Sequence, residues 1–400
     1  MSDFRTVLVR ITGPDEPGIS ADLFATLAEM EASVVDIEQI VVRRRLTLDV
    51  LIEVPPGDSA LKDILLFGFK RNLSIDVEEI DDEPSEYRRP HVVTIVGPEL
   101  TPTEIKAATD AIANGGANID RIVRLSRFPV MSYELRISGG DPDRIRSDLV
   151  EAAATHAGMD VAIQREGLSR RAKRLVVIDV DSTLIQDEVV DVLAQEAGVG
   201  DQVAAITAAA MAGELDFSES LRQRVALLEG LDELAVERAW RRINLTPGAR
   251  TFCRTLERLG YTMGTVSGGF TVFTERIRKE LGIRYGLANE LEAENGRLTG
   301  KIVGDVVDRA AKAEFLIDVA KTEGIPLEQT VAIGDGANDL DLMSTAGLSI
   351  AFNAKPIVRE AADTSLRVPY LDAVLFLLGI SREEVEAADL EADLWPGNGA

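Results

Sequence analysis

Arg174-Leu-Val-Val-Ile-Asp-Val-Asp-Ser-Thr-Leu184 is the stretch that decides the fold of this chain. Its apolar run, residues 175–178, is typical of a buried strand in a parallel sheet. The run ends in two carboxylates, Asp179 and Asp181, and ligands of open α/β sheets bind beyond the carboxyl ends of the strands. Residues two apart on a strand lie on the same side, so these charges repel each other unless a cation separates them. Mg²⁺ could lie between the two carboxylates because it binds carboxylate oxygens. An isolated pair of aspartates could equally begin a turn and cap a helix without a metal.

The composition predicts two or three domains, since 400 residues exceed the roughly 100–200 of one domain. With 46% hydrophobic residues the chain can bury sizeable cores. No apolar run reaches the ~18–20 residues of a membrane span, and we expect no secretory segment at the start. The single cysteine, Cys253, excludes an intrachain disulfide and a cysteine-based metal site. We therefore expect a cytoplasmic protein.

The net charge of −25, from 68 acidic and 43 basic residues, disfavours nucleic acid or an anionic membrane as a partner. It also disfavours anionic substrates unless their site is locally positive. Salt screens exposed charges beyond roughly 8 Å, so the negative net charge has little effect inside a site. A metal ion, one lysine and helix amides could therefore make the site locally positive.

The first 167 residues contain one order of elements twice, which predicts two tandem ferredoxin-like α+β domains at 1–82 and 90–167. The acidic, proline-containing segment 81–90 is expected to link them. We expect strands at 6–12, 33–42, 46–54 and 73–80 with helices at 19–31 and 58–71, and then strands at 91–96, 119–126, 130–137 and 160–165 with helices at 103–114 and 142–157.

The loop Gly13-Pro-Asp-Glu-Pro-Gly-Ile19 precedes the first expected helix. It resembles the D-x-P-G loop of ACT domains, which are regulatory modules that bind amino acids. Gly18 would let a ligand approach the backbone, and the helix start would favour a carboxylate, so Asp15 and Gly18 are candidate regulatory-site residues. A tight turn without a ligand explains the same residues. In the second domain, the corresponding stretch Gly97-Pro-Glu-Leu-Thr-Pro-Thr103 has no glycine opening the helix, so this domain is the one expected to have lost ligand binding if either has.

A third domain is expected at 168–385, followed by an acidic tail at 386–400 whose last five residues we expect to be disordered. About sixty mostly helical residues, at about 187–247, are inserted after the first strand, and we expect them to form a cap that excludes water. We expect further strands at 261–266, 330–333 and 348–352, helices at 249–259, 311–321, 355–362 and 371–378, and a hairpin at 289–301.

Three later motifs accompany the pair of carboxylates. They are Ser267-Gly-Gly at the end of a strand, Lys312 near the start of a helix, and Gly334-Asp-Gly-Ala-Asn-Asp339 after another strand. Alone, each is explained by a turn or by an ordinary surface lysine. In this order, the four motifs resemble the signature of the haloacid dehalogenase-like phosphohydrolases, a Rossmann-like α/β fold with a cap.

Within that superfamily, the third domain resembles the phosphoserine phosphatases, because Glu188, Phe217 and Arg224 match their motifs. The resemblance implies that Glu188 and Arg224 bind the amino group and carboxylate of serine, and that the aromatic ring closes over it. Such pairing is reasonable because arginine can bind a carboxylate with two hydrogen bonds. Without the resemblance, Glu188 would be an ordinary exposed helix residue. The whole chain is similar to the ACT-containing phosphoserine phosphatases of actinobacteria.

The resemblance implies hydrolysis of O-phospho-L-serine, the last step of serine biosynthesis. Asp179 would be the nucleophile and Asp181 the general acid and base, with Mg²⁺ bound by Asp179, Asp335 and the backbone carbonyl of Asp181. Phosphate would be held by Ser267, Gly268, Lys312 and Asn338, and Asp339 would orient the metal waters or Lys312.

L-serine, or another amino acid, is expected to bind near Asp15 and Gly18 at an interface within a homodimer. Two alternatives stay open. One is a phosphatase of this superfamily for another small phosphate ester, and the other is a non-catalytic protein that senses amino acids.

Overall fold

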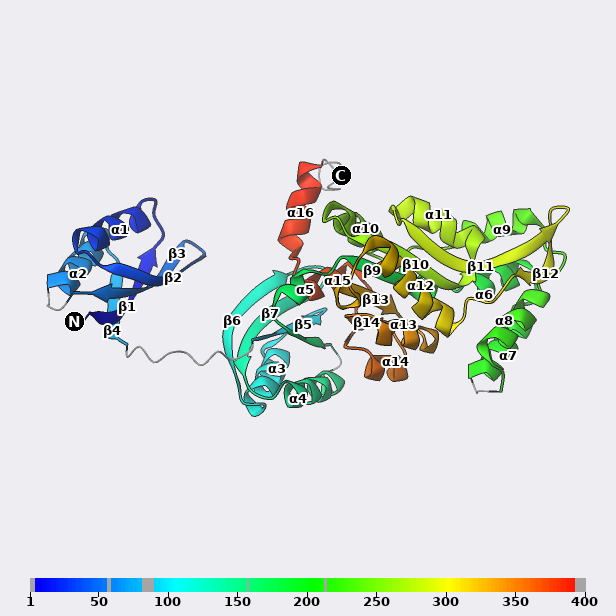
Figure 1. Cartoon of the computed structure of the whole chain (residues 1–400), viewed down its shortest axis with the longest axis horizontal. Helices are drawn as coiled ribbons and strands as arrows, with labels where there is room; N and C mark the ends of the chain where they lie inside the picture. The colour runs from blue at the N-terminus through cyan, green and yellow to red at the C-terminus, as the bar shows by residue number, and fades with distance from the viewer. Residues whose placement is uncertain (1–3, 56–58, 81–89, 157, 212–213, 393–400) are drawn as a thin grey trace. The chain divides into compact units, whose positions relative to one another are not determined.

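The computed structural model describes residues 4–55, 59–80, 90–156, 158–211 and 214–392. The chain divides into two compact units, Met1–Tyr87 and Arg88–Ala400. The second unit contains a ferredoxin-like domain and an α/β domain (Figure 1). The expected linker and the last residues of the tail lie almost entirely outside the described residues.

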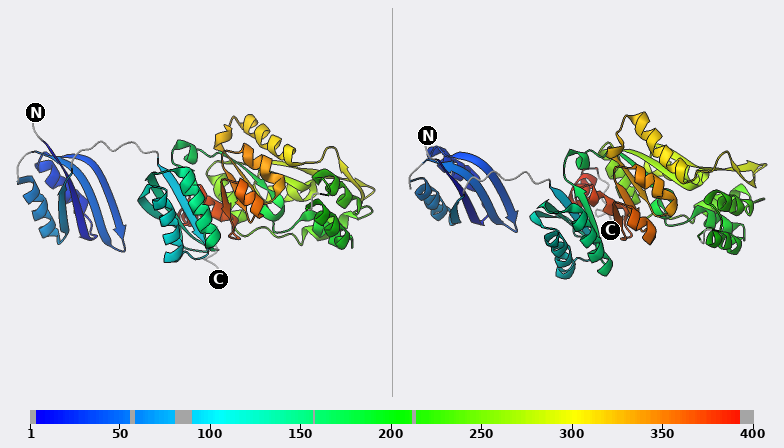
Figure 2. Two further views of the ribbon diagram at one scale, coloured as in Figure 1. Left: turned by 90° about the horizontal axis from the view of Figure 1, so that it is seen from below. Right: turned by 60° about the horizontal axis from the view of Figure 1, so that its bottom comes forward.

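The first unit has the predicted ferredoxin-like order of elements. Its antiparallel sheet has the strand order β2-β3-β1-β4, and both helices cover one face of it (Figure 2). Alternate residues of β1, such as Val7, Val9 and Ile11, are buried beneath these helices, as the period of a strand requires. The elements are β1 (Arg5–Pro14), α1 (Ile19–Glu29), β2 (Ser33–Val42), β3 (Arg45–Val54), α2 (Ser59–Arg71) and β4 (Ser74–Glu79).

The second unit begins with a repeat of the same arrangement, in the strand order β6-β7-β5-β8. Its helices start at side-chain caps, since Thr101 forms a capping box with Glu104 and Asp141 accepts from the amides after it. The elements are β5 (His91–Gly97), α3 (Pro102–Asn114), β6 (Ala117–Ser126), β7 (Met131–Gly139), α4 (Pro142–Thr155) and β8 (Asp160–Arg165).

This domain is bound to the α/β domain through buried polar contacts. The buried carboxylate of Asp160 accepts from the backbone amide and the Nε of Arg367, each at 2.7 Å. Gln164 donates to the carbonyl of Leu377 at 2.9 Å, which adds a second contact. The two domains therefore form one compact body.

The α/β domain is built on a seven-stranded sheet in the order β12-β11-β10-β9-β13-β14-β15. Strand β9 (Leu175–Asp179) is central and pairs in parallel with both β10 and β13. Along β9, Val176 and Ile178 belong to one hydrophobic cluster and Leu175 and Val177 to another, so both faces of the sheet are covered. This confirms the doubly covered α/β fold expected from the apolar run. The strands are β9, β10 (Thr262–Phe270), β11 (Tyr285–Glu294), β12 (Arg297–Val303), β13 (Thr330–Gly334), β14 (Ser349–Phe352) and β15 (Thr364–Leu366).

The helices expected around this sheet are present, together with two that were not expected, at 271–281 and 340–345. Those of the core are α10 (Ala249–Arg258), α11 (Thr271–Leu281), α12 (Arg309–Glu323), α13 (Leu340–Thr345), α14 (Pro356–Ala361) and α15 (Val374–Leu377), with a short α5 (Leu168–Arg171) before β9. The inserted cap consists of α6 (Val189–Glu196), α7 (Gly200–Met211), α8 (Phe217–Ala226) and α9 (Glu233–Trp240). The cap lies beside the β11–β12 hairpin (Figure 1), which turns at Asn295-Gly296 with positive φ at both residues.

Two expectations need correction. The strand expected at 261–266 does not end at Val266 but continues as β10 to Phe270, so Ser267-Gly-Gly forms part of its end, where the pairing is irregular. Helix α16 (Arg382–Glu391), which starts at a capping box of Ser381 and Glu384, continues into the segment expected as a tail. The buried Asp389 of α16 binds Arg254 and Arg258 of α10, so residues 386–391 belong to the folded domain.

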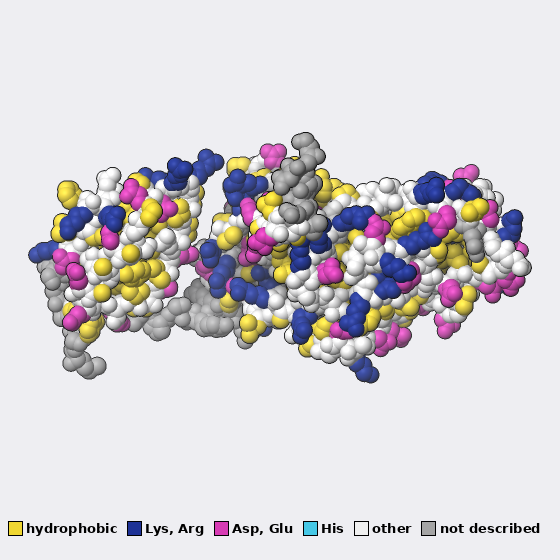
Figure 3. All heavy atoms as spheres, turned by 90° about the horizontal axis from the view of Figure 1, so that it is seen from above, with side chains coloured by type: hydrophobic (Ala, Val, Ile, Leu, Met, Phe, Trp, Pro, Cys, Tyr) yellow, Lys and Arg dark blue, Asp and Glu magenta, His cyan; other side chains and the backbone are white. Residues whose placement is uncertain are grey.

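Within the described residues, no helix combines the length and apolarity that crossing a membrane requires. Acidic and basic side chains are interspersed over the face drawn in Figure 3. The negative net charge is therefore not gathered into one patch on that face.

Candidate active site

Three carboxylates meet where the central strands end. Asp179 ends β9, and Asp335 and Asp339 follow β13, the strand beside it. One oxygen of each lies within 4.8 Å of the others, so the three could hold a metal ion. Parallel strands have their carboxyl ends at one edge of the sheet, and this is why Asp179 converges with residues 156 and 160 positions later in the chain. The side chain of Asp181, in contrast, is not part of this group.

Lys312 lies beneath these carboxylates and is completely buried. Its Nζ donates to Oδ1 of Asp179 at 2.5 Å and to Oδ1 of Asp339 at 2.7 Å. Burial alone would lower the pKa of Lys312, but the charges of the two carboxylates raise it overall, so this lysine carries a positive charge. Asp339 thus holds Lys312 in place next to Asp179.

Asp181 is fixed by contacts on both oxygens. Its Oδ1 accepts from the amide of Val189 at 2.8 Å, and its Oδ2 accepts from the hydroxyl of Ser267 at 2.7 Å. Burial raises the pKa of Asp181, and the bond from Ser267 opposes that rise. The hydroxyl of Ser267 also accepts from the amide of Gly269. The hydroxyl of Ser267 therefore binds Asp181 and does not line the cavity.

A turn between β9 and the cap brings Glu188 to the same site. Within it, Ser182 has φ +56°, a backbone conformation that is uncommon for a residue with a side chain. The hydroxyl of Ser182 donates to Oε1 of Glu188 at 2.8 Å. Solvent reaches Glu188 through the cavity, yet protein encloses most of its carboxylate. This desolvation, followed by the charge of Asp181, raises the pKa of Glu188.

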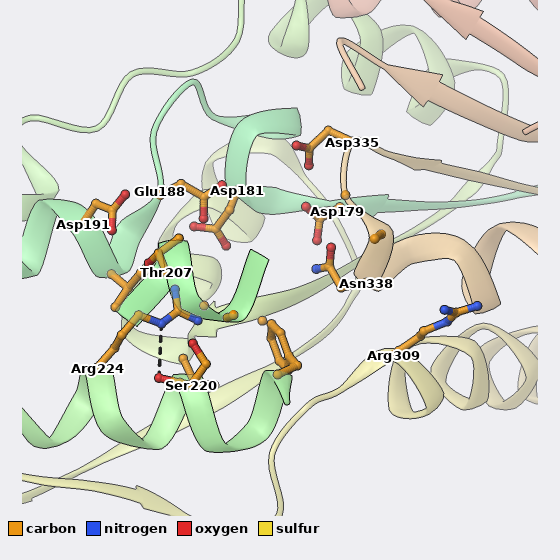
Figure 4. A pocket seen from close by; sticks show the side chains of 18 of the residues that line it. Asp179, Asp181, Glu188, Asp191, Thr207, Ser220, Arg224, Arg309, Asp335 and Asn338 are labelled. Atoms are coloured by element: carbon orange, nitrogen blue, oxygen red, sulfur yellow. Dashed lines mark hydrogen bonds between the residues drawn. The ribbon is translucent and has the colours of Figure 1, made fainter. Parts of the chain in front are cut away.

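A cavity of about 720 Å³ connects these groups with the cap. Figure 4 shows Asp179 and Asp335 at one end, Arg224 at the other, and Asp181 and Glu188 between them. Besides these five, the polar or charged residues lining it are Asp191, Thr207, Ser220, Arg309, Asn338 and Lys355. The structure therefore brings together most predicted residues of the α/β domain, whereas Ser267, Lys312 and Asp339 lie behind the cavity wall.

Phe217, at the start of cap helix α8, contacts the core at Gly268. A Cβ on Gly268 would lie only 2.8 Å from Cζ of Phe217, so only glycine allows the ring to lie this close. Both residues line the cavity. The ring therefore closes the cavity between the cap and strand β10.

Arg224 projects into the cavity from the same helix. Burial lowers the pKa of Arg224, while the charges of Asp191, Glu188 and Asp181 oppose that effect. Arg224 is accordingly a partly buried cation among acidic groups. A substrate with both a carboxylate and an amino group fits the pair formed by Arg224 and Glu188.

Sequence reasoning missed Asn289, a buried residue of β11. Its amide nitrogen donates to the carbonyls of Gly268 and Gly269, and its Oδ1 accepts from the amide of Val307. Asn289 thereby fixes the backbone of the Ser267-Gly-Gly motif. Only its place at the start of the expected hairpin, 289–301, could have drawn attention to it.

The regulatory candidates Asp15 and Gly18 lie in the loop between β1 and α1 of the first unit. Gly18 has φ +91°, which favours glycine, and Asp15 donates its backbone amide to the carbonyl of Arg44 at 2.9 Å. Arg71 reaches the same loop, and it forms an ion pair with Asp22 of α1. A basic side chain therefore lies close to the helix start.

Comparisons with known proteins match all three domains. The pattern of the haloacid dehalogenase-like hydrolases matches residues 176–344, and ACT domain patterns match residues 5–78 and 89–164. The chain is 51% identical to a phosphoserine phosphatase of Streptomyces coelicolor over 397 residues, which are 98% of this chain and 96% of that protein. The chain belongs to the phosphoserine phosphatase family. It is also 47% identical to a phosphoserine phosphatase of Mycobacterium tuberculosis, over 96% of this chain and 95% of that protein.

Solved structures agree with this family assignment. A probable phosphoserine phosphatase from Vibrio cholerae is 32% identical with a TM-score of 0.58, covering 75% of this chain and 88% of that one. A haloacid dehalogenase family hydrolase from Salmonella enterica is 28% identical with a TM-score of 0.64, covering 72% and 98%. As a phosphoserine phosphatase, the chain has its nucleophile candidate, Asp179, inside the matched hydrolase pattern.

Proposed function

We propose that this phosphatase hydrolyses O-phospho-L-serine to L-serine and phosphate as the last step of serine biosynthesis in the cytoplasm. One observation carries the proposal: a single cavity joins the carboxylates near Lys312 to the Glu188–Arg224 pair. The first group suits phosphoryl transfer, and the second suits the two charged groups of an amino acid.

Asp179 attacks phosphorus, and the bond from phosphorus to the serine oxygen breaks as the aspartyl-phosphate bond forms. Asp181, whose pKa burial raises, gives its proton to the leaving serine oxygen. In the second displacement Asp181 takes a proton from the incoming water, which attacks phosphorus and releases Asp179. Asn338 and the amide of Gly268 hold the phosphoryl oxygens in both steps, and the positive charge of Lys312 behind the cavity wall offsets their negative charge.

A divalent cation fits the carboxylates at this edge. Five acidic side chains line the cavity (Asp179, Asp181, Glu188, Asp191 and Asp335), against three basic ones (Arg224, Arg309 and Lys355). Burial and the charge of Asp339 raise the pKa of Asp179 well above its usual range, which disfavours the ionised nucleophile. Mg²⁺, bound by Asp179, Asp335 and the backbone carbonyl of Asp181, would neutralise phosphoryl oxygens and favour ionised Asp179.

The test is phosphate release from phosphoserine, phosphothreonine and p-nitrophenyl phosphate, each with and without Mg²⁺. We expect Mg²⁺-dependent turnover with the highest kcat/KM for phosphoserine. A higher kcat/KM for an ester without an amino-acid moiety would favour the alternative phosphatase, and no release would favour the non-catalytic alternative.

We also propose that L-serine binds near Asp15 and Gly18 between two copies of the chain. Strand β2 supports this, because it lies at the edge of its sheet and exposes Val35, Ile37 and Val42 by 55%, 44% and 63%. An exposed apolar edge strand favours pairing with another copy. The charge of Arg71 beside the loop supports a carboxylate ligand.

A further inference from the structure

Ser220 on cap helix α8 has a buried hydroxyl that no group of the protein satisfies. The residue is 1% exposed, lines the cavity, and its Oγ has no hydrogen-bond partner. Across the part of the chain that the structure describes, it is the only such buried side-chain atom belonging to a residue that lines the cavity. Unsatisfied hydroxyls in other places, such as those of Thr94 and Ser132, do not line this cavity.

Ser220 and Arg224 are held together on one face of α8. They are one helical turn apart, and Nε of Arg224 donates to the backbone carbonyl of Ser220 at 3.3 Å. Figure 4 shows the hydroxyl of Ser220 beside the guanidinium of Arg224, both on the side of the cavity. The buried Leu221 and Val225 fix this helix in the main hydrophobic cluster, so both polar groups have fixed positions.

A buried serine inside a helix commonly donates to the carbonyl four residues earlier. That carbonyl, of Asp216, accepts the backbone amide of Ser220 at 2.9 Å, and no bond from the hydroxyl to it is formed. Alanine would form the helix better and would bury no unpaired hydroxyl. A serine hydroxyl that destabilises the free protein in this way, and that lies next to the substrate cavity, is expected to form its hydrogen bond with the bound substrate.

We propose that the hydroxyl of Ser220 donates a hydrogen bond to the carboxylate of the substrate's amino-acid moiety, next to Arg224. This inference rests on the proposed hydrolysis of phosphoserine and deepens it. A carboxylate has about four acceptor sites, so one guanidinium does not satisfy it in a desolvated cavity. Ser220 is thus a specificity-determining residue for substrates that carry a carboxylate beside the phosphate ester.

The experiment compares Ser220→Ala with the wild-type full chain on two substrates, O-phospho-L-serine and O-phosphoethanolamine, which lacks the carboxylate. We expect KM for phosphoserine to rise about tenfold, the worth of one hydrogen bond to a charged group, with kcat unchanged. Kinetics with phosphoethanolamine should not change, and Tm should stay the same or rise because a buried unpaired hydroxyl is removed. Ser218→Ala, on the same helix but outside the cavity lining, is the matched control and should change neither substrate's KM.

Two results would overturn the inference. One is an unchanged KM for phosphoserine in Ser220→Ala, and the other is an equal loss on both substrates, which indicates a purely structural role. Arg224→Ala separates this inference from the proposed function. If Arg224→Ala selectively loses activity on phosphoserine and Ser220→Ala does not, only the role of Ser220 is contradicted. If the wild-type chain does not hydrolyse phosphoserine, the proposed function fails first.

Discussion

Arg224 is the residue that we expect to distinguish phosphoserine from simpler esters. Arg224→Ala removes a charged donor from a partly buried site, so KM for phosphoserine should rise roughly 10- to 100-fold. The KM for p-nitrophenyl phosphate, which has no carboxylate, should change little. Steady-state kinetics on both substrates measures this, and equal changes would argue against a carboxylate site.

We expect Asp335 to link metal binding to pH. Burial, with the charge of Asp339 added, raises the pKa of Asp335 from 3.8 to about 7 in the metal-free protein. A carboxyl whose pKa is higher in the folded than in the unfolded protein contributes to stability in full at pH values below its unfolded pKa. This contribution is lost as the pH rises toward the folded pKa of about 7. Mg²⁺ binds the ionised form, so the rise in Tm that Mg²⁺ causes should be larger at about pH 8 than at about pH 6.

Thermal unfolding with and without Mg²⁺ at both pH values measures this difference. Asp335→Asn is the control, and it should lose most of the Mg²⁺-induced shift at either pH. An equal shift at the two pH values in the wild-type protein would contradict a role for Asp335 as a titrating ligand.

At the scale of elements, helix α16 should contribute to stability rather than to catalysis. Asp389→Ala removes ion pairs with Arg254 and Arg258, whose side chains are 30% and 28% exposed and can be solvated. We expect the free energy of unfolding to fall by about 2 kcal/mol, with kcat unchanged. Denaturant unfolding measures it, and Glu391→Ala, at the exposed end of α16, should have almost no effect.

The sequence predicted those elements that a local pattern of residues identifies. The apolar run before Asp179 and the Asn295-Gly296 turn required no knowledge of the rest of the fold. Helix α16 was missed because its acidic composition hides a single buried carboxylate, Asp389, whose partners are about 130 residues away. The extension of β10 through Ser267-Gly-Gly was missed because two glycines there indicated a turn.

The candidate site was predictable only in part for a similar reason. Motif spacing indicated that Asp179, Lys312 and Asp335 belong together, and the structure places them together. Asn289 and Ser220 belong to no motif, since an amide on a strand and a hydroxyl on a helix are common. Their importance depends on which backbone or cavity the fold places beside them.

At the scale of the whole molecule, the two ferredoxin-like domains differ in how they are attached. The second is bound to the α/β domain through Asp160 and Arg367, whereas the first forms a unit of its own. Apart from the end of the α/β domain, which α16 extends beyond residue 385, the limits predicted for the separate domains stay predictions. Regulation by an amino acid would have to act through the first domain, where the glycine-containing loop lies.

Calorimetric titration of L-serine into the full-length Arg224→Ala variant tests that regulation. This variant should bind the product L-serine only weakly at the active site, so the heat of binding at the first domain can be measured separately. We expect binding that is lost when Gly18→Ala is added, since φ +91° is strained for alanine. Sedimentation should show a dimer in the wild-type protein. Binding that persists in the double variant would place L-serine elsewhere.

The most direct test of the account is to trap the phosphoenzyme. After rapid acid quenching of the wild-type enzyme with phosphoserine and Mg²⁺, peptide mass spectrometry should find one phosphoryl group on Asp179, removable by hydroxylamine. Asp179→Asn should show neither this group nor turnover. Turnover retained in Asp179→Asn, or a phosphoryl group on another residue, would contradict the assignment of Asp179 as the nucleophile.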